Sequence, residues 1–149
     1  MHHPAVFTVE DANRRVPYLQ VITRDIVALV GDLHERRERL SEISRLAGES
    51  PHSEEVVEMQ KTMERDRLQL QAFEEELRHA DVRLVDRLSG MVEIRSRMDD
   101  RLVWLNWQPG ESEFMYWRAA DDDRMMRRPL FESISGSGKG FPEDIQSDC

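Results

Sequence analysis

The sequence predicts an α+β fold in which a long antiparallel helical hairpin is followed by a small antiparallel β-meander. Two observations favour this fold. Apolar residues recur at spacings of three and four over residues 16–47 and again over 53–80, which is the period of helices packed in a coiled coil. Beyond residue 80 the pattern changes to short runs rich in β-branched and aromatic residues, which is typical of strands.

A short helix is expected over residues 9–15, ahead of the hairpin. Thr8 stands three residues before Asp11, as in a capping box, so its hydroxyl can accept a hydrogen bond from the first turn of the helix. Pro17 is tolerated in the first turn of a helix but not in its interior. We therefore expect a break after residue 15 and a second helix that begins at residue 16.

The two long helices are expected to fold back on each other. The stretch 47–52 contains Gly48, which predicts a helix end and a turn, and Ser53 can cap the next helix. A charged residue interrupts each apolar seam once, at Arg36 and at Asp66, and a turn in that stretch places the two opposite each other. They form either an interhelical ion pair that fixes the register, or two side chains that extend separately into solvent.

Four strands are expected, over residues 82–86, 91–95, 102–107 and 113–118. The last two are joined by Gln-Pro-Gly-Glu at 108–111, which matches a type II turn. Opposing Leu105 to Phe114, and Val103 to Tyr116, places four residues on the face away from the helices: Trp104, Asn106, Met115 and Trp117. We expect this patch to be covered by a second subunit, by the segment after residue 118, or by a ligand.

The chain is expected to form one domain over residues 1–131, because 149 residues suffice for a single core. Residues 132–149 are rich in glycine, serine and acidic side chains and contain few apolar ones. Such a segment cannot bury enough apolar area to offset the entropy of ordering, so we expect a disordered acidic tail.

Composition excludes several classes of function. The net charge of −9 disfavours nucleic-acid binding, which depends on Lys and Arg that neutralise phosphates. The single cysteine, Cys149, allows no internal disulfide, and no stretch is apolar enough to span a membrane, so we expect a cytoplasmic protein. Glu76 and His79 have the spacing of a metal-ligating pair, but a second such pair is missing from the sequence, so no metal or other cofactor is expected.

An ordered set of segments also points to a known family. It consists of Phe7–Asn13 followed by Pro17, then Gly90–Ile94, Asp100–Trp107, Gly110-Glu111, Tyr116–Arg118 and Arg127–Leu130. With these segments the chain resembles an uncharacterised bacterial family, domain of unknown function 2203. The resemblance implies a helical hairpin followed by a small sheet, and it brings no established activity.

The chain departs from the pattern of that family at three positions. Where the family pattern has Asp, Cys and His, this sequence has Glu93, Asn106 and Arg118. The first set, brought together on neighbouring strands, could bind a transition metal. The second set is a poor soft-metal site, because a guanidinium has no free lone pair to donate.

The candidate functional surface combines arginine with tryptophan. It comprises Trp104, Asn106, Met115, Trp117, Arg118, Arg127 and Arg128. Our first hypothesis is a non-catalytic interaction module that self-associates as a homodimer through this surface, since Trp, Met and Arg are enriched at interfaces. The alternative is a sensor or enzyme with a pocket for a small anionic ligand, with Glu93 or Glu111 as general acid or base.

Overall fold

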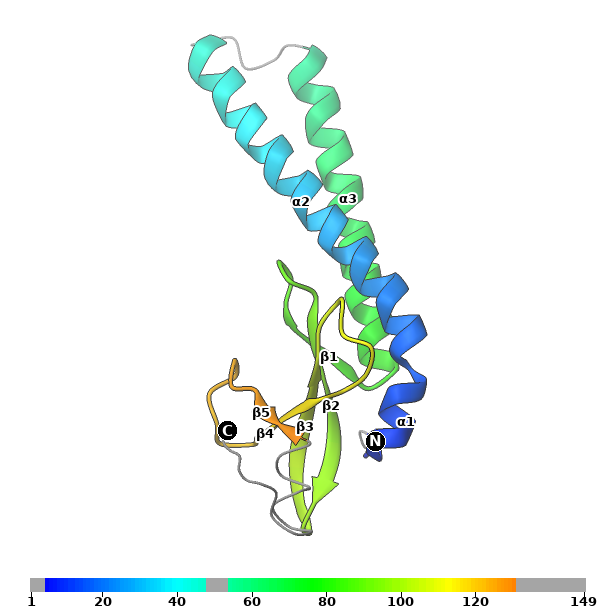
Figure 1. Ribbon diagram of the computed structural model, residues 1–149. Coiled ribbons are helices and arrows are strands. Elements are labelled where there is room, and N and C mark those ends of the chain that lie inside the picture. Colours follow the sequence, from blue (N-terminus) through cyan, green and yellow to red (C-terminus); the bar gives the residue numbers. More distant parts are fainter. Residues whose placement is uncertain (1–4, 48–53, 131–149) are drawn as a thin grey trace.

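The computed structural model describes residues 5–47 and 54–130, which form an α+β fold (Figure 1). The helices are α1 (Val9–Arg14), α2 (Val16–Ala47) and α3 (Glu54–His79). The strands are β1 (Val82–Asp86), β2 (Met91–Met98), β3 (Arg101–Trp107), β4 (Tyr116–Ala119) and β5 (Arg128–Pro129). The expected turn with Gly48 and Ser53 and the expected tail at 132–149 lie outside the described residues.

The N-terminal helices follow the predicted capping and proline positions. The Thr8 side chain accepts a hydrogen bond of 3.0 Å from the backbone nitrogen of Asp11, so the predicted cap is confirmed. Helix α2 begins at Val16, which places Pro17 in its first turn, where the missing N–H has no intrahelical partner to lose. The chain changes direction at this junction (Figure 1).

Helices α2 and α3 pack side by side along the predicted apolar seams. Leu33 of α2 and Met63 and Leu70 of α3 are buried there. At the predicted seam defect, Arg36 Nη1 lies 2.5 Å from Asp66 Oδ2, so of the two alternatives the ion pair forms. Nearer the sheet, Tyr18 Oη donates to Glu76 Oε2 at 3.0 Å, and burial together with this carboxylate raises the pKa of Tyr18 to about 12.

One end of the hairpin packs on the sheet, and the other end projects beyond it (Figure 1). The core therefore lies at the base, between α1, the adjoining ends of α2 and α3, and one face of the sheet. Its members are apolar side chains from all of these elements, including Ala12, Leu19, Ile22, Ile26, Leu77, Val92, Ile94, Val103, Leu105, Trp107, Phe114 and Trp117.

The sheet is antiparallel, with strand order β1-β2-β3-β4-β5. Strand β2 runs three residues further than predicted, because Asp99 and Asp100 form a tight turn with φ of 51° and 64°. Aspartate tolerates this left-handed region better than most side chains do. The expected longer connection at 96–101 is therefore wrong.

The type II turn at 108–111 is confirmed, but the strand that follows begins later than predicted. The Glu111 nitrogen donates to the Gln108 carbonyl at 3.1 Å, and Gly110 has φ of +102°. The Trp107 indole then donates to the Glu111 carbonyl at 2.8 Å, and the Phe114 nitrogen donates to Asn13 Oδ1 at 2.7 Å. These two contacts keep residues 111–115 out of the pairing with β3, which begins at Tyr116.

The late start of β4 changes its register on β3. Leu105 opposes Trp117 instead of Phe114, and Val103 opposes Ala119 instead of Tyr116, so the predicted register is wrong by three residues. An odd shift exchanges the two faces of a strand. Trp117 consequently joins the core. Arg118 takes its place on the face away from the helices.

Strand β5 was not predicted. Its two residues, Arg128 and Pro129, pair with Trp117 and Tyr116 of β4, and the Leu130 nitrogen donates to the Met115 carbonyl at 2.8 Å. A strand this short carries no period in its sequence, so only tertiary contacts reveal it. Within the described part of the chain, no helix has the length and apolar character needed to cross a membrane.

We expect a measurable but small coupling between Arg36 and Asp66. The two side chains are 36% and 21% exposed, so solvent weakens their attraction, and a double-mutant cycle with Arg36→Ala and Asp66→Ala should give about 0.5–1 kcal/mol in unfolding free energy. Urea denaturation of the four variants provides the cycle. A coupling of zero would show that the ion pair does not help to fix the register.

Candidate anion-binding groove

The face of the sheet away from the helices carries an ionic and aromatic layer. The register places Arg83 beside Glu93 and Glu93 beside Asn106 in one row. A second row runs from Arg95 through Trp104 to Arg118. Two of these charged residues are almost fully buried: Glu93 is 0% exposed and Arg118 is 3% exposed.

Glu93 and Arg118 form a bidentate ion pair across β3. Arg118 Nε donates to Glu93 Oε2 at 2.5 Å, and Nη2 donates to Oε1 at 3.1 Å. The Glu93 hydrogen bond, together with Coulombic attraction to Glu93 and to Asp122 and Asp123, raises the pKa of Arg118 against the opposing effect of burial. Removing one partner of such a pair leaves a charge buried without compensation.

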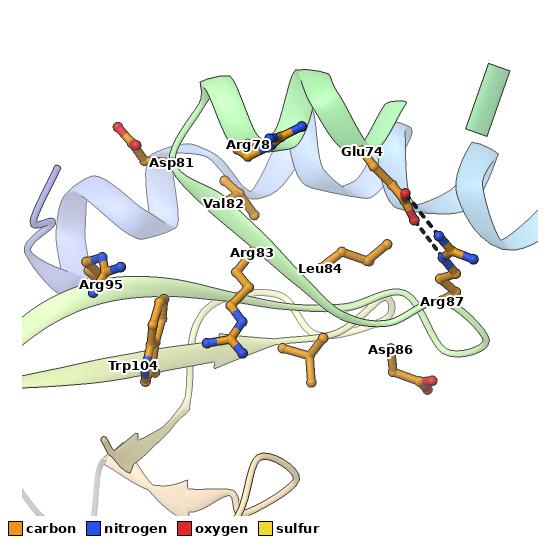
Figure 2. Close-up of a pocket in the computed structure, with 11 residues that line it drawn as sticks. Glu74, Arg78, Asp81, Val82, Arg83, Leu84, Asp86, Arg87, Arg95 and Trp104 are labelled. Carbon is orange, nitrogen blue, oxygen red and sulfur yellow. Dashed lines mark hydrogen bonds and ion pairs between the residues drawn. The ribbon is translucent and has the colours of Figure 1, made fainter. Parts of the chain in front are cut away.

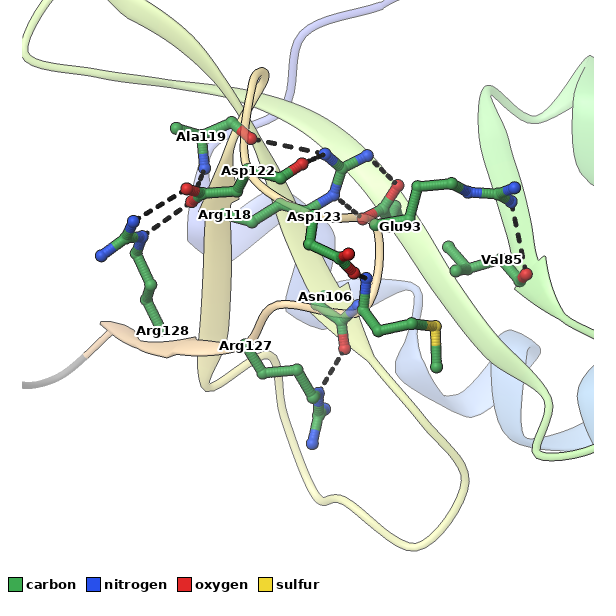
Figure 3. Close-up of polar contacts among 11 residues, drawn as sticks. Val85, Glu93, Asn106, Arg118, Ala119, Asp122, Asp123, Arg127 and Arg128 are labelled. Carbon is green, nitrogen blue, oxygen red and sulfur yellow. Dashed lines mark hydrogen bonds and ion pairs between the residues drawn. The ribbon is translucent and has the colours of Figure 1, made fainter.

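Residues 119–128, which we call the covering segment, lie over this layer (Figure 3). Arg118 Nη1 donates to the Asp122 carbonyl at 3.2 Å, and the Ala119 nitrogen donates to Asp122 Oδ2 at 2.8 Å. Further along, Arg124 Nη2 donates to the Val85 carbonyl of β1 at 3.4 Å. Of the three covers expected for this face, the segment after residue 118 therefore provides one.

Asn106 lies under the covering segment with half of its amide satisfied. Its Oδ1 accepts from Arg127 Nε at 2.7 Å, while Arg127 Nη2 donates to Glu111 Oε1 at 2.7 Å. Asn106 Nδ2 is buried and has no hydrogen-bond partner among the described residues. A buried donor without an acceptor costs about 1–3 kcal/mol, so this amide is a weak point of the layer.

The predicted surface is divided by this arrangement. Trp117 is 9% exposed and lies in the core, and Asn106 and Arg118 are buried under the covering segment. Four of its members keep some exposure: Trp104, Met115, Arg127 and Arg128. Arg128 binds Asp122 through Nε at 2.7 Å and Nη2 at 2.8 Å, and Arg127 lies over the Tyr116 ring. The seven residues thus do not form one continuous patch.

A cavity of about 1000 Å³ lies beside this surface, along the outer edge of β1 (Figure 2). We call it the β1 groove. It is lined by the whole of β1 together with Glu74, Arg78, Asp81, Arg87, Arg95 and Trp104. The connection from α3 to β1 is short, because Asp81 adopts a left-handed φ of 61°, and this places the last turns of α3 along one side of the groove.

Two of the four arginines that line the groove bind carboxylates. Arg87 binds Glu74 through Nε at 2.6 Å and Nη2 at 3.1 Å, and Arg78 binds Glu75. Asp86 accepts from the Ser89 nitrogen at 3.1 Å, and hydrogen bonds from Ser89 lower the pKa of Asp86. These three groups are committed within the protein.

Arg83 and Arg95 make no ion pair or hydrogen bond through their side chains with the described residues. Their guanidinium carbons instead lie 5.2 Å and 4.7 Å from the centre of the Trp104 ring. Figure 2 shows the indole between the two groups. A cation–π contact of this kind orients a guanidinium without neutralising it, so both keep their donors for an anion.

Trp104 belongs to the surface predicted from the sequence, whereas Arg83 and Arg95 do not. A signal for Arg95 was present: the two-residue turn at Asp99–Asp100 places Arg95 directly opposite Trp104. The place of Arg83 follows only from the pairing of β1 with β2, which contains a bulge between Leu84 and Asp86. In the described part of the chain, no three His, Cys, Asp or Glu side chains gather as a metal site.

We expect Glu93→Gln to destabilise the protein by roughly 3–5 kcal/mol, because it leaves the Arg118 charge buried without its counter-charge. Chemical denaturation measures the loss. The double variant Glu93→Leu with Arg118→Met should recover much of it, since replacing both charges removes the uncompensated one. A loss below about 1 kcal/mol for the single variant would contradict the importance of the pair.

Acid should weaken the anchor of the covering segment at Asp122. The hydrogen bond from Arg128, with that from the Ala119 backbone, lowers the pKa of Asp122 from 3.8 to about 2. A lowered folded-state pKa stabilises the native state above the unfolded value, and this stabilisation is lost as the pH falls from about 3.8 to about 2. Over this range the stability difference between wild type and Asp122→Asn should shrink, as measured by denaturation. A constant difference would contradict the anchor.

Comparison with known proteins gives a family without an activity. Residues 5–130 match the profile of a family described as an uncharacterized conserved protein. Neither the curated proteins nor the solved structures contain a match. Because the match covers nearly all of the described chain, the protein belongs to the family known as domain of unknown function 2203.

Proposed function

We propose that this protein is a binding module whose β1 groove takes an anionic partner. One observation carries the proposal: Arg83 and Arg95 lie on either side of Trp104 beside a cavity of about 1000 Å³, and neither side chain binds a carboxylate of the described chain. Guanidinium groups form strong, directional bonds to carboxylates and phosphates. An anion in the groove would supply the counter-charge that the described residues do not give these two groups.

A catalytic role has less support from the geometry. Of the two suggested acid–base groups, Glu93 is fully buried and bound by Arg118. Glu111 accepts from the Gln108 nitrogen at 3.0 Å and from Arg127 at 2.7 Å. Both carboxylates are engaged by arginine, and neither lines the groove.

The structure also gives less support to a homodimer formed through the sheet. The apolar patch that favoured a homodimer included Trp117, which packs in the core, and Asn106, which the covering segment buries. What remains exposed near Trp104 is dominated by arginine. A surface of like charges is repelled by a second copy of itself, whereas an anionic partner is attracted to it.

Titration with poly-L-glutamate and with citrate, followed by tryptophan fluorescence, tests the proposal. Trp104 is the groove tryptophan, and Trp107 and Trp117 are buried, so binding should change the Trp104 emission and the change should be absent in Trp104→Phe. Arg83→Gln and Arg95→Gln should each weaken binding by roughly 10-fold or more, since a charged hydrogen bond contributes about 1.5–3 kcal/mol.

Arg97→Gln is the matched control. Arg97 lies on the same strand and the same face as Arg95 but outside the groove, so its replacement removes the same charge and should leave binding within about 2-fold of wild type. If neither polyglutamate nor citrate binds, or if Arg97→Gln weakens binding as much as Arg83→Gln does, the groove is not the anion site.

A further inference from the structure

The floor of the β1 groove is the open edge of a β-sheet. Among the strands of residues 5–47 and 54–130, β1 stands at the end of the order and pairs with β2 on one side only. Each of its residues, Val82 to Asp86, lines the groove. An open strand edge presents main-chain N–H and C=O groups at regular spacing, which is the surface to which an extended peptide adds as a further strand.

The two walls of the groove match the two faces that such a strand would present. Val82 and Leu84 share the sheet face that packs toward the helices, and their register partners Ile94 and Val92 are core residues. Arg83 lies on the opposite face, toward Trp104 and Arg95 (Figure 2). Side chains of an added strand would point alternately to these two walls.

The side chains of the two walls determine which residues should alternate in the added strand. On one wall, the guanidiniums of Arg83 and Arg95 contact the Trp104 ring and form no ion pair with the described residues, so they suit acidic side chains. On the other wall Val82 and Leu84 are apolar, and its charged groups, Glu74 and Arg78, are already paired. A segment in which acidic and apolar residues alternate therefore complements the groove.

We propose that the β1 groove binds an extended peptide as an additional strand of the sheet, with acidic side chains on Arg83 and Arg95 and apolar side chains toward α3. This proposal rests on the proposed function above and names the class of anionic partner. The main chain of the peptide pairs with the main chain of Val82–Leu84. The pairing ends before the bulge between Leu84 and Asp86, where the Val85 carbonyl accepts from Arg124.

A peptide fits this edge better than a second copy of the chain does. Pairing of two β1 edges would bring a second Arg83 beside the Arg83 of the edge strand and near Arg95 of β2, where like charges repel. An acidic strand brings the opposite charge to the same position. Charge complementarity thus favours the peptide.

Fluorescence polarisation with labelled Glu-Val-Glu-Val-Glu-Val-Glu tests the proposal on the full chain. Two analogues are compared, N-methylated at all glutamates or at all valines, because neighbouring residues of a strand direct their N–H groups to opposite edges. The analogue methylated on the edge that meets β1 should bind at least roughly 10-fold more weakly, and the other within about 3-fold of the parent.

A scrambled peptide, Glu-Glu-Glu-Glu-Val-Val-Val, controls for charge alone and should bind at least roughly 10-fold more weakly than the alternating one. Amide hydrogen exchange provides a second readout. Addition of the alternating peptide should slow exchange at the edge-facing amides of Val82–Leu84, while those of the turn at Asp99–Asp100 stay unchanged. Arg83→Gln should remove this protection, and Arg97→Gln should keep it.

The outcomes separate the two proposals. Binding of citrate and of both N-methylated analogues with affinities like that of the parent overturns strand addition but leaves an anion site in the groove. Absence of binding by every anion overturns both proposals. A dimer in light scattering that Arg83→Gln strengthens and the peptide does not dissociate overturns strand addition, because the edge is then occupied by a second copy.

Discussion

The buried ion pair between Glu93 and Arg118 is the constraint on which the outer face of the sheet depends. It joins β2 to β4 across the intervening β3, and both side chains are almost completely buried. Any register that separated them would leave two charges in a medium that solvates them poorly, at a cost of several kcal/mol. The pair therefore selects the position of β4, and with it the place where the covering segment begins.

The position of β4 also determines which side chains the rest of this face exposes. With Arg118 on the face away from the helices, Trp117 fills the core beside Leu105, and Trp104 lies half-buried between the guanidiniums of Arg83 and Arg95. Arg118 holds the Asp122 carbonyl, and the covering segment then runs as far as Val85. One bidentate contact thus anchors the segment that covers the middle of the face, while β1, at the end of the described strand order, has no further strand beside it.

The parts of the fold that could be predicted from the sequence are those governed by local periodicity. The heptad seams gave α2, α3 and the opposition of Arg36 to Asp66, and turn chemistry gave the capping of α1 and the turn at 108–111. The register of β4 could not be predicted in this way. It depends on two contacts between distant positions, the Glu93–Arg118 ion pair and the hydrogen bond from the Phe114 backbone to Asn13, and no local pattern contains either of them.

The residues of the candidate site also differ in whether the sequence could predict them. The three departures from the family pattern, Glu93, Asn106 and Arg118, lie on the neighbouring strands β2, β3 and β4. Their chemistry is that of an ion pair beside an amide, because Arg118 donates hydrogen bonds where a metal ligand would need a lone pair. The groove arginines were missed for the opposite reason. They lie on ordinary-looking strands, and only the pairing of β1 with β2 and of β2 with β3 brings them to one tryptophan.

The charge balance of the chain makes the uncommitted arginines informative. The chain has 30 acidic side chains against 21 lysines and arginines, so carboxylates to neutralise any one arginine are in excess. Arg87 and Arg78, on the same groove, each have one. Arg83 and Arg95 instead share Trp104, where the ring attraction of about 0.5–1 kcal/mol per exposed contact acts against the repulsion between the two charges. Within the described part of this acid-rich chain, two neighbouring guanidiniums lie without a carboxylate, and this supports the proposal that a partner supplies the counter-charge at the β1 edge.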